Sequence, residues 1–464
     1  MLHSTRVLRL IRFHWMCAAP LLLGGCTAAS SQLATDSTAA YFAQTEEELP
    51  ESTAPKPLAE PSSSAEPEKL PPSMATAEVA EGMTLKECEQ LALEQHPKLA
   101  SAAEAITAAE GRAWQAGRPP NPQIGTGSGQ LAGYQSQYNA FFSQDIIGGG
   151  KLNLDAAAGR VEADQMRLSH VRATFDVLTA VRRHFYRTLA AQRRVEQLDD
   201  IRRISAKSAQ IGQDLLKAGE GAKPDVLILE VEAKKAEVAQ QNAKSNLTSA
   251  RQQLAIAVGN PDLSIGSLAG NLGVHFPELD SLSAQAQALE NNAELARADA
   301  EVRRSSLLLE RAMVQPKPDF NIMGGYQYQL EKLHNQAIFQ FMMSVPLWDR
   351  NRGGIDAARA NHMRAHADFE QTRLALAGQA TDALNRYRQA SEQVRSYEVE
   401  LLPRTKESLE LTQQLYEKGH ADFLDVLAVQ RTLQEINLNF IDALEARAAA
   451  AADLGGLLQL EEFP

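Results

Sequence analysis

Two segments decide the fold: Phe320-Asn-Ile-Met-Gly-Gly-Tyr-Gln-Tyr-Gln-Leu330 and Gln336-Ala-Ile-Phe-Gln-Phe-Met-Met-Ser-Val-Pro346. In both, apolar side chains alternate with Asn, Gln or Ser, which is typical of a β-strand with one apolar and one polar face. Each run is about ten residues long, the length of a strand that crosses a membrane. A soluble, half-buried hairpin has the same alternation, so periodicity alone leaves that alternative open.

A second, weaker pair of strands is predicted at 121–131 and 136–146. Tyr138 and Phe142 keep the alternation, whereas Gly125, Gly127 and Gly129 weaken the first run. Backbone groups in lipid must all be hydrogen-bonded, so an open sheet of four strands cannot lie in a bilayer. Two copies of the chain would close eight strands with little room inside, and three copies would close twelve strands around a channel.

The chain repeats its layout in two halves, 84–259 and 281–458. Each half predicts a helix of roughly 30 residues, a proline cluster, two strands, a very long helix and a final helix. The turns before the two final helices correspond at a constant offset, because Gly219 and Asp225 lie 200 residues before Gly419 and Asp425. Glycines are expected to form the turn from strand to long helix in each half: Gly148, Gly149 and Gly150, then Gly353 and Gly354.

The helices are predicted to pack side by side as in a coiled coil. Residues 160–211 contain neither Pro nor Gly, so this helix can extend roughly 75–80 Å. The final helix of the second half has an apolar residue at nine of ten positions spaced alternately three and four apart. These positions are Val426, Val429, Leu433, Ile436, Phe440, Ala443, Arg447, Ala450, Leu454 and Leu457.

The N-terminus predicts an exported, lipid-anchored protein. Residues 1–25 combine three arginines with a short apolar stretch that ends in Leu23-Gly-Gly-Cys26. This ending resembles the bacterial lipobox, in which Cys26 becomes the acylated N-terminus of the mature protein. Thr27 follows the cysteine. An aspartate at that position would resemble the signal that retains lipoproteins in the inner membrane, so the resemblance to lipoproteins implies the outer membrane. Residues 26–80 are rich in Ser, Ala, Pro, Glu and Thr, which predicts a disordered linker.

Composition excludes several classes of function. The net charge is −12, so a nucleic-acid partner is not expected. Three cysteines are too few for a disulfide framework, and Cys88 has the setting of a small apolar helix residue. His362 and His366 lie four residues apart, but no third ligand has convincing spacing, so a solvated helix face is favoured and no metal or cofactor is expected. Catalytic motifs are absent from the sequence, and the protein is not expected to be an enzyme.

The order of these elements resembles the TolC-like outer-membrane efflux proteins over about residues 84–458. The pieces that resemble the family include Thr84-Leu-Lys-Glu-Cys-Glu-Gln-Leu-Ala92, Asn121-Pro122, Ser143-Gln-Asp-Ile-Ile-Gly-Gly-Gly-Lys151 and Ser344-Val-Pro-Leu-Trp-Asp-Arg-Asn-Arg-Gly-Gly-Ile355. The last is most similar to the CzcC-like branch, which exports divalent metal cations. The resemblance implies a mainly α fold and a homotrimer with a 12-stranded β-barrel in the outer membrane. It also implies a long α-helical barrel that extends into the periplasm.

The resemblance also implies partners and sites. The partners are a periplasmic adaptor (a membrane fusion protein), an inner-membrane RND-type pump and the lipid of the outer membrane. Asp425, with Asp422 in place of a second acid, corresponds to the aspartates of the periplasmic gate, although both residues can simply cap a helix. The candidate contacts with the adaptor lie in the two turns: Gly219, Asp225, Gly419 and His420.

Two other functions remain open at this stage. The outlet channel of a type I protein-secretion system has the same fold, and the substrate is not determined by the sequence. A periplasmic structural lipoprotein made of coiled coils would have no pore, and the alternating runs 320–330 and 336–346 argue against it.

Overall fold

A computed structural model describes residues 82–130, 133–219, 221–273, 280–290, 292–418, 420–461 and 463, all within the compact unit 77–464. The predicted signal peptide 1–25, the lipidation residue Cys26 and the linker 26–80 lie outside the described residues. Gly419 also lies outside them.

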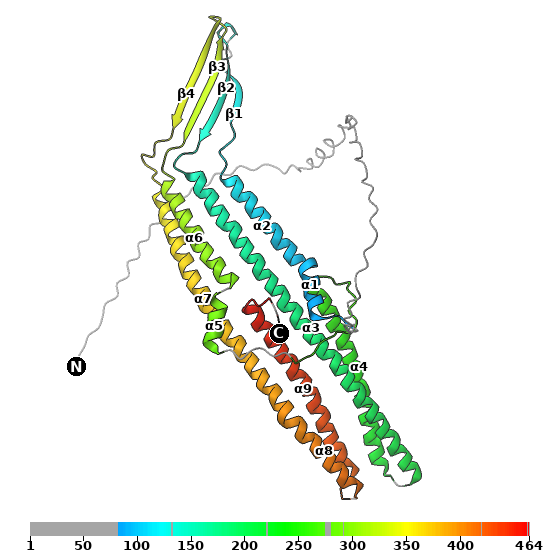
Figure 1. Ribbon diagram of the computed structural model, residues 1–464. Coiled ribbons are helices and arrows are strands. Elements are labelled where there is room, and N and C mark those ends of the chain that lie inside the picture. Colours follow the sequence, from blue (N-terminus) through cyan, green and yellow to red (C-terminus); the bar gives the residue numbers. More distant parts are fainter. Residues whose placement is uncertain are drawn as a thin grey trace, which may run out of the picture. The chain divides into compact units, whose positions relative to one another are not determined.

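Four antiparallel strands form one sheet in the order β1-β2-β3-β4 (Figure 1). The strands are β1 (Gln123–Gln130), β2 (Gln137–Ile146), β3 (Phe320–Gln329) and β4 (His334–Met343), with a short 3-10 turn, η1 (Gly133–Gln135), after β1. All four predicted strands are confirmed. β4 begins two residues earlier than expected, because His334 pairs with Gln329 and Leu333 turns the chain with a φ of 54°.

The described residues also contain nine α-helices and one π-helical segment. The first half contains α1 (Leu85–Gln95), α2 (Pro97–Ala116), α3 (Lys151–Ala218) and α4 (Lys223–Val258). The second half contains α5 (Ser281–Glu290), α6 (Ala293–Val314), α7 (Arg352–Arg395), the π-helix η2 (Ser396–Leu401), α8 (Leu402–Glu417) and α9 (Phe423–Leu457). The layout is therefore duplicated.

The single helix of roughly 30 residues expected at the start of each half is wrong, because each is two helices. In the first half, His96 has an extended backbone, its Nδ1 accepts the Lys98 N–H at 3.1 Å, and Pro97 opens α2. In the second half, Asn292 is also extended, and its side-chain oxygen accepts the Glu294 N–H at 2.9 Å. A residue that caps a new helix has left the preceding one.

The long helices differ between the halves. α3 is continuous over 68 residues, about 100 Å at 1.5 Å per residue. Its counterpart in the second half is interrupted by η2, immediately before Pro403 in the first turn of α8. Proline lacks an N–H, and its ring clashes with the carbonyl four residues earlier. The wider π turn relieves this conflict, and the Leu402 N–H bonds to Tyr397 O, five residues back.

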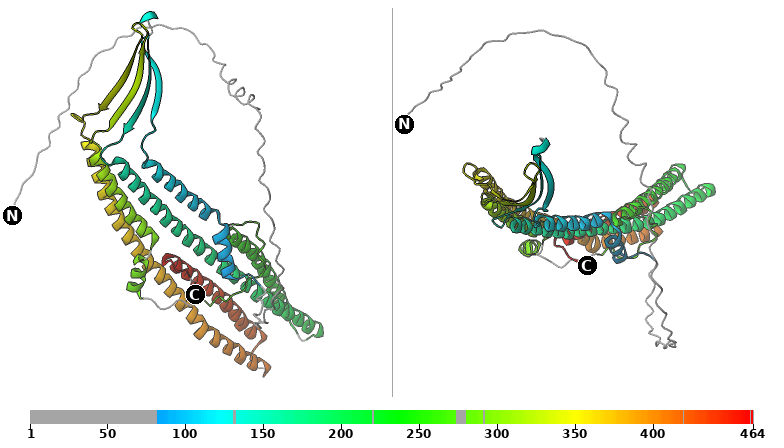
Figure 2. Two further views of the ribbon diagram at one scale, coloured as in Figure 1. Left: turned by 45° about the horizontal axis from the view of Figure 1, so that its top comes forward. Right: turned by 90° about the horizontal axis from the view of Figure 1, so that it is seen from above.

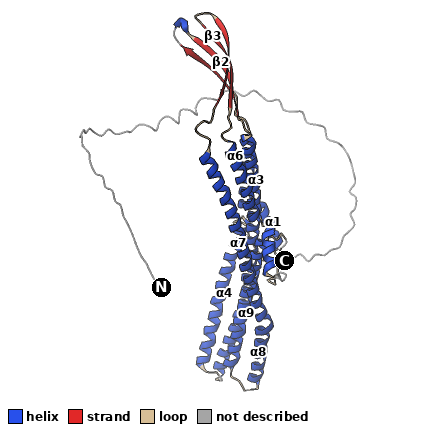
Figure 3. Ribbon diagram, turned by 90° about the vertical axis from the view of Figure 1, so that its left-hand side faces the viewer, coloured by secondary structure: helices blue, strands red, loops and turns tan. Residues whose placement is uncertain are grey.

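The shorter helices stack end to end beside the long ones (Figures 1 and 3). A side chain at Gly259, after α4, would lie 2.8 Å from the His96 Cα at the start of α2. The Asn292 side-chain amide, at the start of α6, donates to the carbonyl of Leu457 at the end of α9 at 3.2 Å. As a result, α2 and α4 flank α3, while α6 and α9 lie between α3 and α7.

Together these helices form a curved layer that continues the sheet (Figure 2). α1, α5 and the C-terminal end of the chain lie on the convex face of this layer. There α1 packs its Cys88 and Ala92 against α3 in the main apolar core, which also includes Phe185 and Leu454. The convex face is therefore thickened at mid-height, whereas the layer elsewhere is one helix deep.

Candidate functional site

One face of the sheet is apolar and exposed. Residues paired across neighbouring strands point to the same side, and one set of pairs is largely apolar. Exposure of its side chains reaches 85% at Ile124 and 75% at Phe339. Such a large exposed apolar surface indicates contact with lipid or another protein. Its apolar members are Ile124, Tyr138, Ala140, Phe142, Ile146, Phe320, Ile322, Tyr326, Tyr328, Ala337, Phe339, Phe341 and Met343, and the same face carries Thr126, Ser128, Gln144, Gly324 and Asn335.

The opposite face is largely polar and internally hydrogen-bonded. The Gln327 amide donates to Gln137 Oε1 at 2.8 Å. The Asn321 amide donates to Ser143 Oγ at 2.9 Å and to Asp145 Oδ1 at 2.7 Å. The predicted alternation is thus confirmed for most of the sheet, with Met323, Ile338 and Met342 as apolar exceptions on this face. The polar side is suited to contact with water.

Phe141 is an aromatic residue on this polar face, and two glycines make room for it. A Cβ at Gly125 would lie 2.5 Å from the Phe141 ring, and one at Gly325 would lie 3.1 Å from the Phe141 Cβ. Gly125, which weakened the prediction of β1, is therefore a packing requirement of the sheet.

The sheet has two open edges. Within the described residues, the outer sides of β1 and β4 have no strand partner. Exposed edges bind further strands or other chains, and in lipid they must be paired. The two edges are antiparallel to each other, since β1 leads away from the helices and β4 leads back to them (Figure 1). Copies of the chain can therefore pair edge to edge.

An ion pair between a buried lysine and a partly exposed aspartate joins the first strand-to-helix turn to the second half of the chain. Gly149 and Gly150 have φ values of 71° and 74°, and a Cβ at Gly148 would lie 2.5 Å from the Pro318 carbonyl oxygen. This tight turn places Lys151, whose side chain is 3% exposed, 2.9 Å from the Asp319 carboxylate. The glycines of the first half therefore form the turn, as expected.

In the second half, the assignment of Gly353 and Gly354 to the turn itself requires correction. Both lie in the first turn of α7, which begins at Arg352. Asn351 has the left-handed conformation instead, with a φ of 55°. Its side chain lies over Gly354, where an added Cβ would be 2.2 Å from the Asn351 Oδ1. Asparagine is tolerated in this conformation, so the turn does not need a glycine.

The candidate contact residues lie at the far ends of the helical hairpins. Gly219 ends α3 with a φ of 80°, and its N–H bonds to Leu215 O and Leu216 O. Asp225 lies in the first turn of α4 and is exposed. His420 is also exposed, and its N–H donates to Leu415 O at 2.9 Å. These residues are far along the chain from the sheet, at the opposite end of the long helices (Figure 1).

Asp422 and Asp425 are adjacent and exposed at the start of α9. Asp422 is the N-cap of α9, and its N–H donates to Asp425 Oδ2 at 3.0 Å, as in a capping box. The capping role considered from the sequence is therefore present for both residues, with Asp422 as the N-cap and the Asp425 carboxylate as the acceptor of its N–H. One oxygen of its carboxylate remains to face solvent, so capping and a role at an entrance are compatible.

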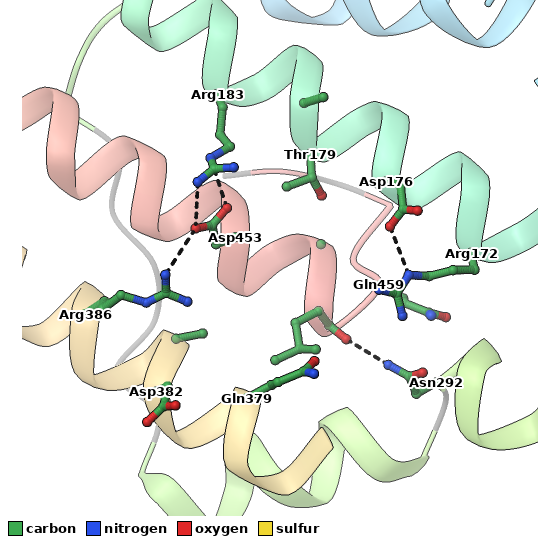
Figure 4. Close-up of a pocket in the computed structure, with 14 residues that line it drawn as sticks. Arg172, Asp176, Thr179, Arg183, Asn292, Gln379, Asp382, Arg386, Asp453 and Gln459 are labelled. Carbon is green, nitrogen blue, oxygen red and sulfur yellow. Dashed lines mark hydrogen bonds and ion pairs between the residues drawn. The ribbon is translucent and has the colours of Figure 1, made fainter. Parts of the chain in front are cut away.

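The sequence did not indicate the charged residues at the stack of α9 on α6 (Figure 4). They line a cavity of about 390 Å³ between α3, α7 and the end of α9. Asp453 lies 3.1 Å from the Arg183 Nε and 3.8 Å from Arg386 Nη1. Burial raises the pKa of Asp453, and the two arginines oppose that rise. The local signal that could have located this junction is Asn292, a residue type that favours the N-cap of a helix.

Another residue that the sequence did not indicate, Arg182, is fully buried on the convex side of α3. Its guanidinium bonds to Glu89 Oε1 at 2.5 Å and to the carbonyls of Leu460 and Glu461 at 3.3 and 3.1 Å. The same group lies 4.8 Å from the centre of the Phe463 ring. It thereby fixes the end of the chain to α1 and α3.

Across the described part of the chain, the structure contains no group of three or more His, Cys, Asp or Glu residues that could hold a metal. Cys88 is buried, and desolvation together with Glu87 and Glu89 raises its pKa to about 11. None of the described helices combines the length and apolar character needed to cross a membrane.

Known proteins match this chain over most of its length. The outer membrane efflux protein family matches residues 89–260 and 285–458. The cobalt-zinc-cadmium resistance protein CzcC of Cupriavidus metallidurans is 27% identical over 383 residues, which cover 82% of this chain and 91% of that protein.

Solved structures show the same fold. The open-state MtrE outer membrane channel of Neisseria gonorrhoeae has a TM-score of 0.68 at 15% identity, covering 83% of this chain and 93% of that one. The CmeC outer membrane channel of Campylobacter jejuni has a TM-score of 0.67 at 13% identity, covering 82% and 87%.

Proposed function

Because the chain belongs to the outer membrane efflux protein family and is the outer-membrane channel of an efflux pump, we propose that three copies enclose one pore for divalent metal cations. The observation that carries this proposal is the sheet with one apolar face, one polar face and two open edges. Three copies contribute twelve strands, which suffices for a water-filled lumen, whereas eight strands are filled by side chains. The helical layers then continue the wall below the membrane.

The number of copies is testable directly. Native mass spectrometry of the detergent-purified protein is expected to give three chains per particle, and heating is expected to convert this species to the monomer in gel electrophoresis. A monomeric or dimeric particle would contradict the closed twelve-stranded wall.

The substrate class is proposed from the similarity to CzcC. CzcC is named for resistance to cobalt, zinc and cadmium, and its match extends over 82% of this chain. A strain that lacks this channel is expected to become more sensitive to divalent cations of this class than to drug-like compounds. Sensitivity to drugs alone, with unchanged growth in metal, would replace the metal assignment while leaving the channel intact.

Asp422 and Asp425 are proposed to form the cation-attracting entrance of the pore. In a trimer, six carboxylates would surround one axis, and a ring of like charge attracts counter-ions and hinders anions. Asp425→Asn, and more strongly the double change with Asp422→Asn, should lower the ratio of cation to anion permeability. Asp214→Asn is a matched control, because that carboxylate is paired with Lys217 at 3.1 Å. Equal effects of both variants would contradict a specific entrance role.

The turn residues are proposed to bind the rest of the pump. Gly219, Asp225, Gly419 and His420 are assigned to contacts with a periplasmic adaptor, which joins the channel to an RND-type inner-membrane pump. A bulky substitution at the exposed His420 should weaken adaptor cross-linking while leaving channel conductance unchanged. Unaltered cross-linking would exclude His420 from the contact.

Cys26 is proposed to carry the lipid that anchors the mature N-terminus to the outer membrane. The Leu23-Gly-Gly-Cys26 sequence and the polar linker to residue 80 support this assignment. Mass spectrometry of the mature protein should show an acylated N-terminal cysteine, and Cys26→Ser should abolish that mass. An unmodified cysteine would contradict the anchor.

A further inference from the structure

Two histidines on α7 lie beside each other close to the sheet end of the helix. His362 and His366 are one turn apart, so their side chains share one face. Their ring centres are 4.8 Å apart, with the ring planes inclined at 76°. Both lie within the first 15 residues of α7, which begins at Arg352.

Ser305 on α6 determines which nitrogen of His362 is protonated. The Ser305 hydroxyl donates its one proton to the carbonyl of Val302 at 2.8 Å. Its oxygen is also 2.9 Å from His362 Nδ1, and it can only accept there. His362 Nδ1 is therefore the N–H donor, and in the neutral ring Nε2 carries the free lone pair.

This arrangement is the one that surrounds histidine ligands of metals. A ligating histidine usually donates its other ring N–H to an oxygen, which fixes the tautomer and the ring orientation. Ser305 is 5% exposed and supplies that oxygen from a neighbouring helix. His366 is exposed, and within the described residues its ring contact is with His362. The second ring can therefore turn to meet a ligand held by the first.

The separation of the rings fits a shared metal. A cation about 2.1 Å from a ring nitrogen lies about 3.2 Å from the ring centre, so two rings at ligand angles between about 90° and 109° have centres about 4.5 to 5.2 Å apart. The observed 4.8 Å falls within that interval. Little movement of the helix backbone is required for both imidazoles to bind one ion.

We propose that His362 and His366 chelate one transition-metal dication per chain, of the class that prefers imidazole: Cu²⁺, Ni²⁺ or Zn²⁺. Water completes the coordination, since the described residues supply no third acidic, cysteine or histidine ligand. The bound ion is expected to exchange, unlike a structural zinc with four protein ligands. The inference is independent of the proposed substrate, because it rests on the geometry of one chain.

The test is a titration of the purified full-length trimer with Cu²⁺ after treatment with chelator. Calorimetry should give one site per chain, and electron paramagnetic resonance should show coupling to two nitrogens. His362→Ala and His366→Ala should each weaken binding at least tenfold and leave one coupled nitrogen at most. His334→Ala is the matched control, because it removes an exposed imidazole at the far end of β4 and should leave this site unchanged.

The Ser305→Ala variant distinguishes a role of Ser305 in orienting His362 from a general loss of structure. This variant keeps both imidazoles and removes the oxygen that orients His362, so the two-nitrogen spectrum should persist with about tenfold weaker binding. The inference is overturned if the wild-type trimer binds no Cu²⁺, or if the double histidine variant retains the two-nitrogen site. Conductance of the same preparations reports on the pore separately, so failure here leaves the channel proposal standing.

Discussion

Lys151 is the residue that ties the sheet of one half to the helices of the other. Its side chain is 3% exposed, and its ammonium bonds to both Asp319 oxygens and to the Lys317 carbonyl at 2.8–2.9 Å. Partial burial opposes ionisation of Asp319, but the hydrogen bonds from Lys151 and Gly148 hold the pKa of this carboxyl below its ordinary value. The positive charge of Lys151 is therefore compensated mainly by the Asp319 carboxylate.

Asp319→Ala should lower the free energy of unfolding by about 3 kcal/mol, because it leaves a buried ammonium without its partner. Chemical denaturation of the trimer, followed by circular dichroism, measures the change. Asp214→Ala breaks an exposed pair with Lys217 and should cost less than about 0.5 kcal/mol. Equal losses from the two variants would show that the strand-to-helix joint does not depend on this ion pair.

Cys88 gives a second prediction at the residue scale. Because its thiol is buried and has a pKa raised to about 11, the folded protein should not react with thiol reagents at pH 8. After denaturation, the mature protein should titrate with one thiol, since Cys17 leaves with the signal peptide and Cys26 is proposed to be acylated. Two thiols in denaturant would contradict acylation, and a reactive native thiol would contradict the packing of α1.

At the scale of elements, the stack of α9 on α6 depends on Asn292. The side chain caps α6 and donates to Leu457 O, so both helix ends lose a partner in Asn292→Ala. A loss of about 1 to 2 kcal/mol is expected in denaturant unfolding. Asn292→Asp retains the side-chain oxygen that caps α6 but not the N–H donor to Leu457 O. Its free energy of unfolding should lie between those of the wild type and Asn292→Ala. If the alanine variant matched the wild type, the stack would not require this cap.

The two faces of the sheet should respond oppositely to charge. Phe339→Lys places an ammonium on the apolar face and should cost about 2 to 4 kcal/mol if that face lies in lipid. Gln340→Lys changes the next residue, on the polar face, and should leave assembly intact. The yield of heat-modifiable trimer in the membrane fraction measures both. Equal yields would contradict a lipid-facing surface at Phe339.

The periodicity of apolar residues in the sequence was sufficient to predict the strands of the sheet, but not the residues at which the helices end. The alternation through Phe339, Gln340 and Phe341 predicted which side chains share a face, because a strand has a fixed period of two. The division of the first helix was missed although Pro97 follows His96 and marks a helix boundary. The contact between Asn292 and Leu457 joins residues 165 apart and has no signature in local sequence.

At the scale of the whole molecule, duplication explains the architecture, and the differences between the halves mark specialised positions. In the first half, Gly149 and Gly150 have the left-handed conformation in the strand-to-helix turn. In the second half, Asn351 has this conformation instead of a glycine. The π turn before Pro403 likewise has no equivalent in α3. Each half supplies two strands and one long helix, but neither half closes its own sheet. Completion of the wall therefore belongs to the assembly of several chains.

In the proposed channel, the polar face of the sheet surrounds water in a pore made by several copies. Single-channel conductance of Gln340→Cys trimers in a planar bilayer, measured before and after a charged methanethiosulfonate reagent, shows whether this face lines the pore. We expect open channels whose conductance falls in up to three steps after the reagent is added, while Phe339→Cys channels are unaffected. Absence of conductance, or a block of Phe339→Cys in place of Gln340→Cys, would contradict it.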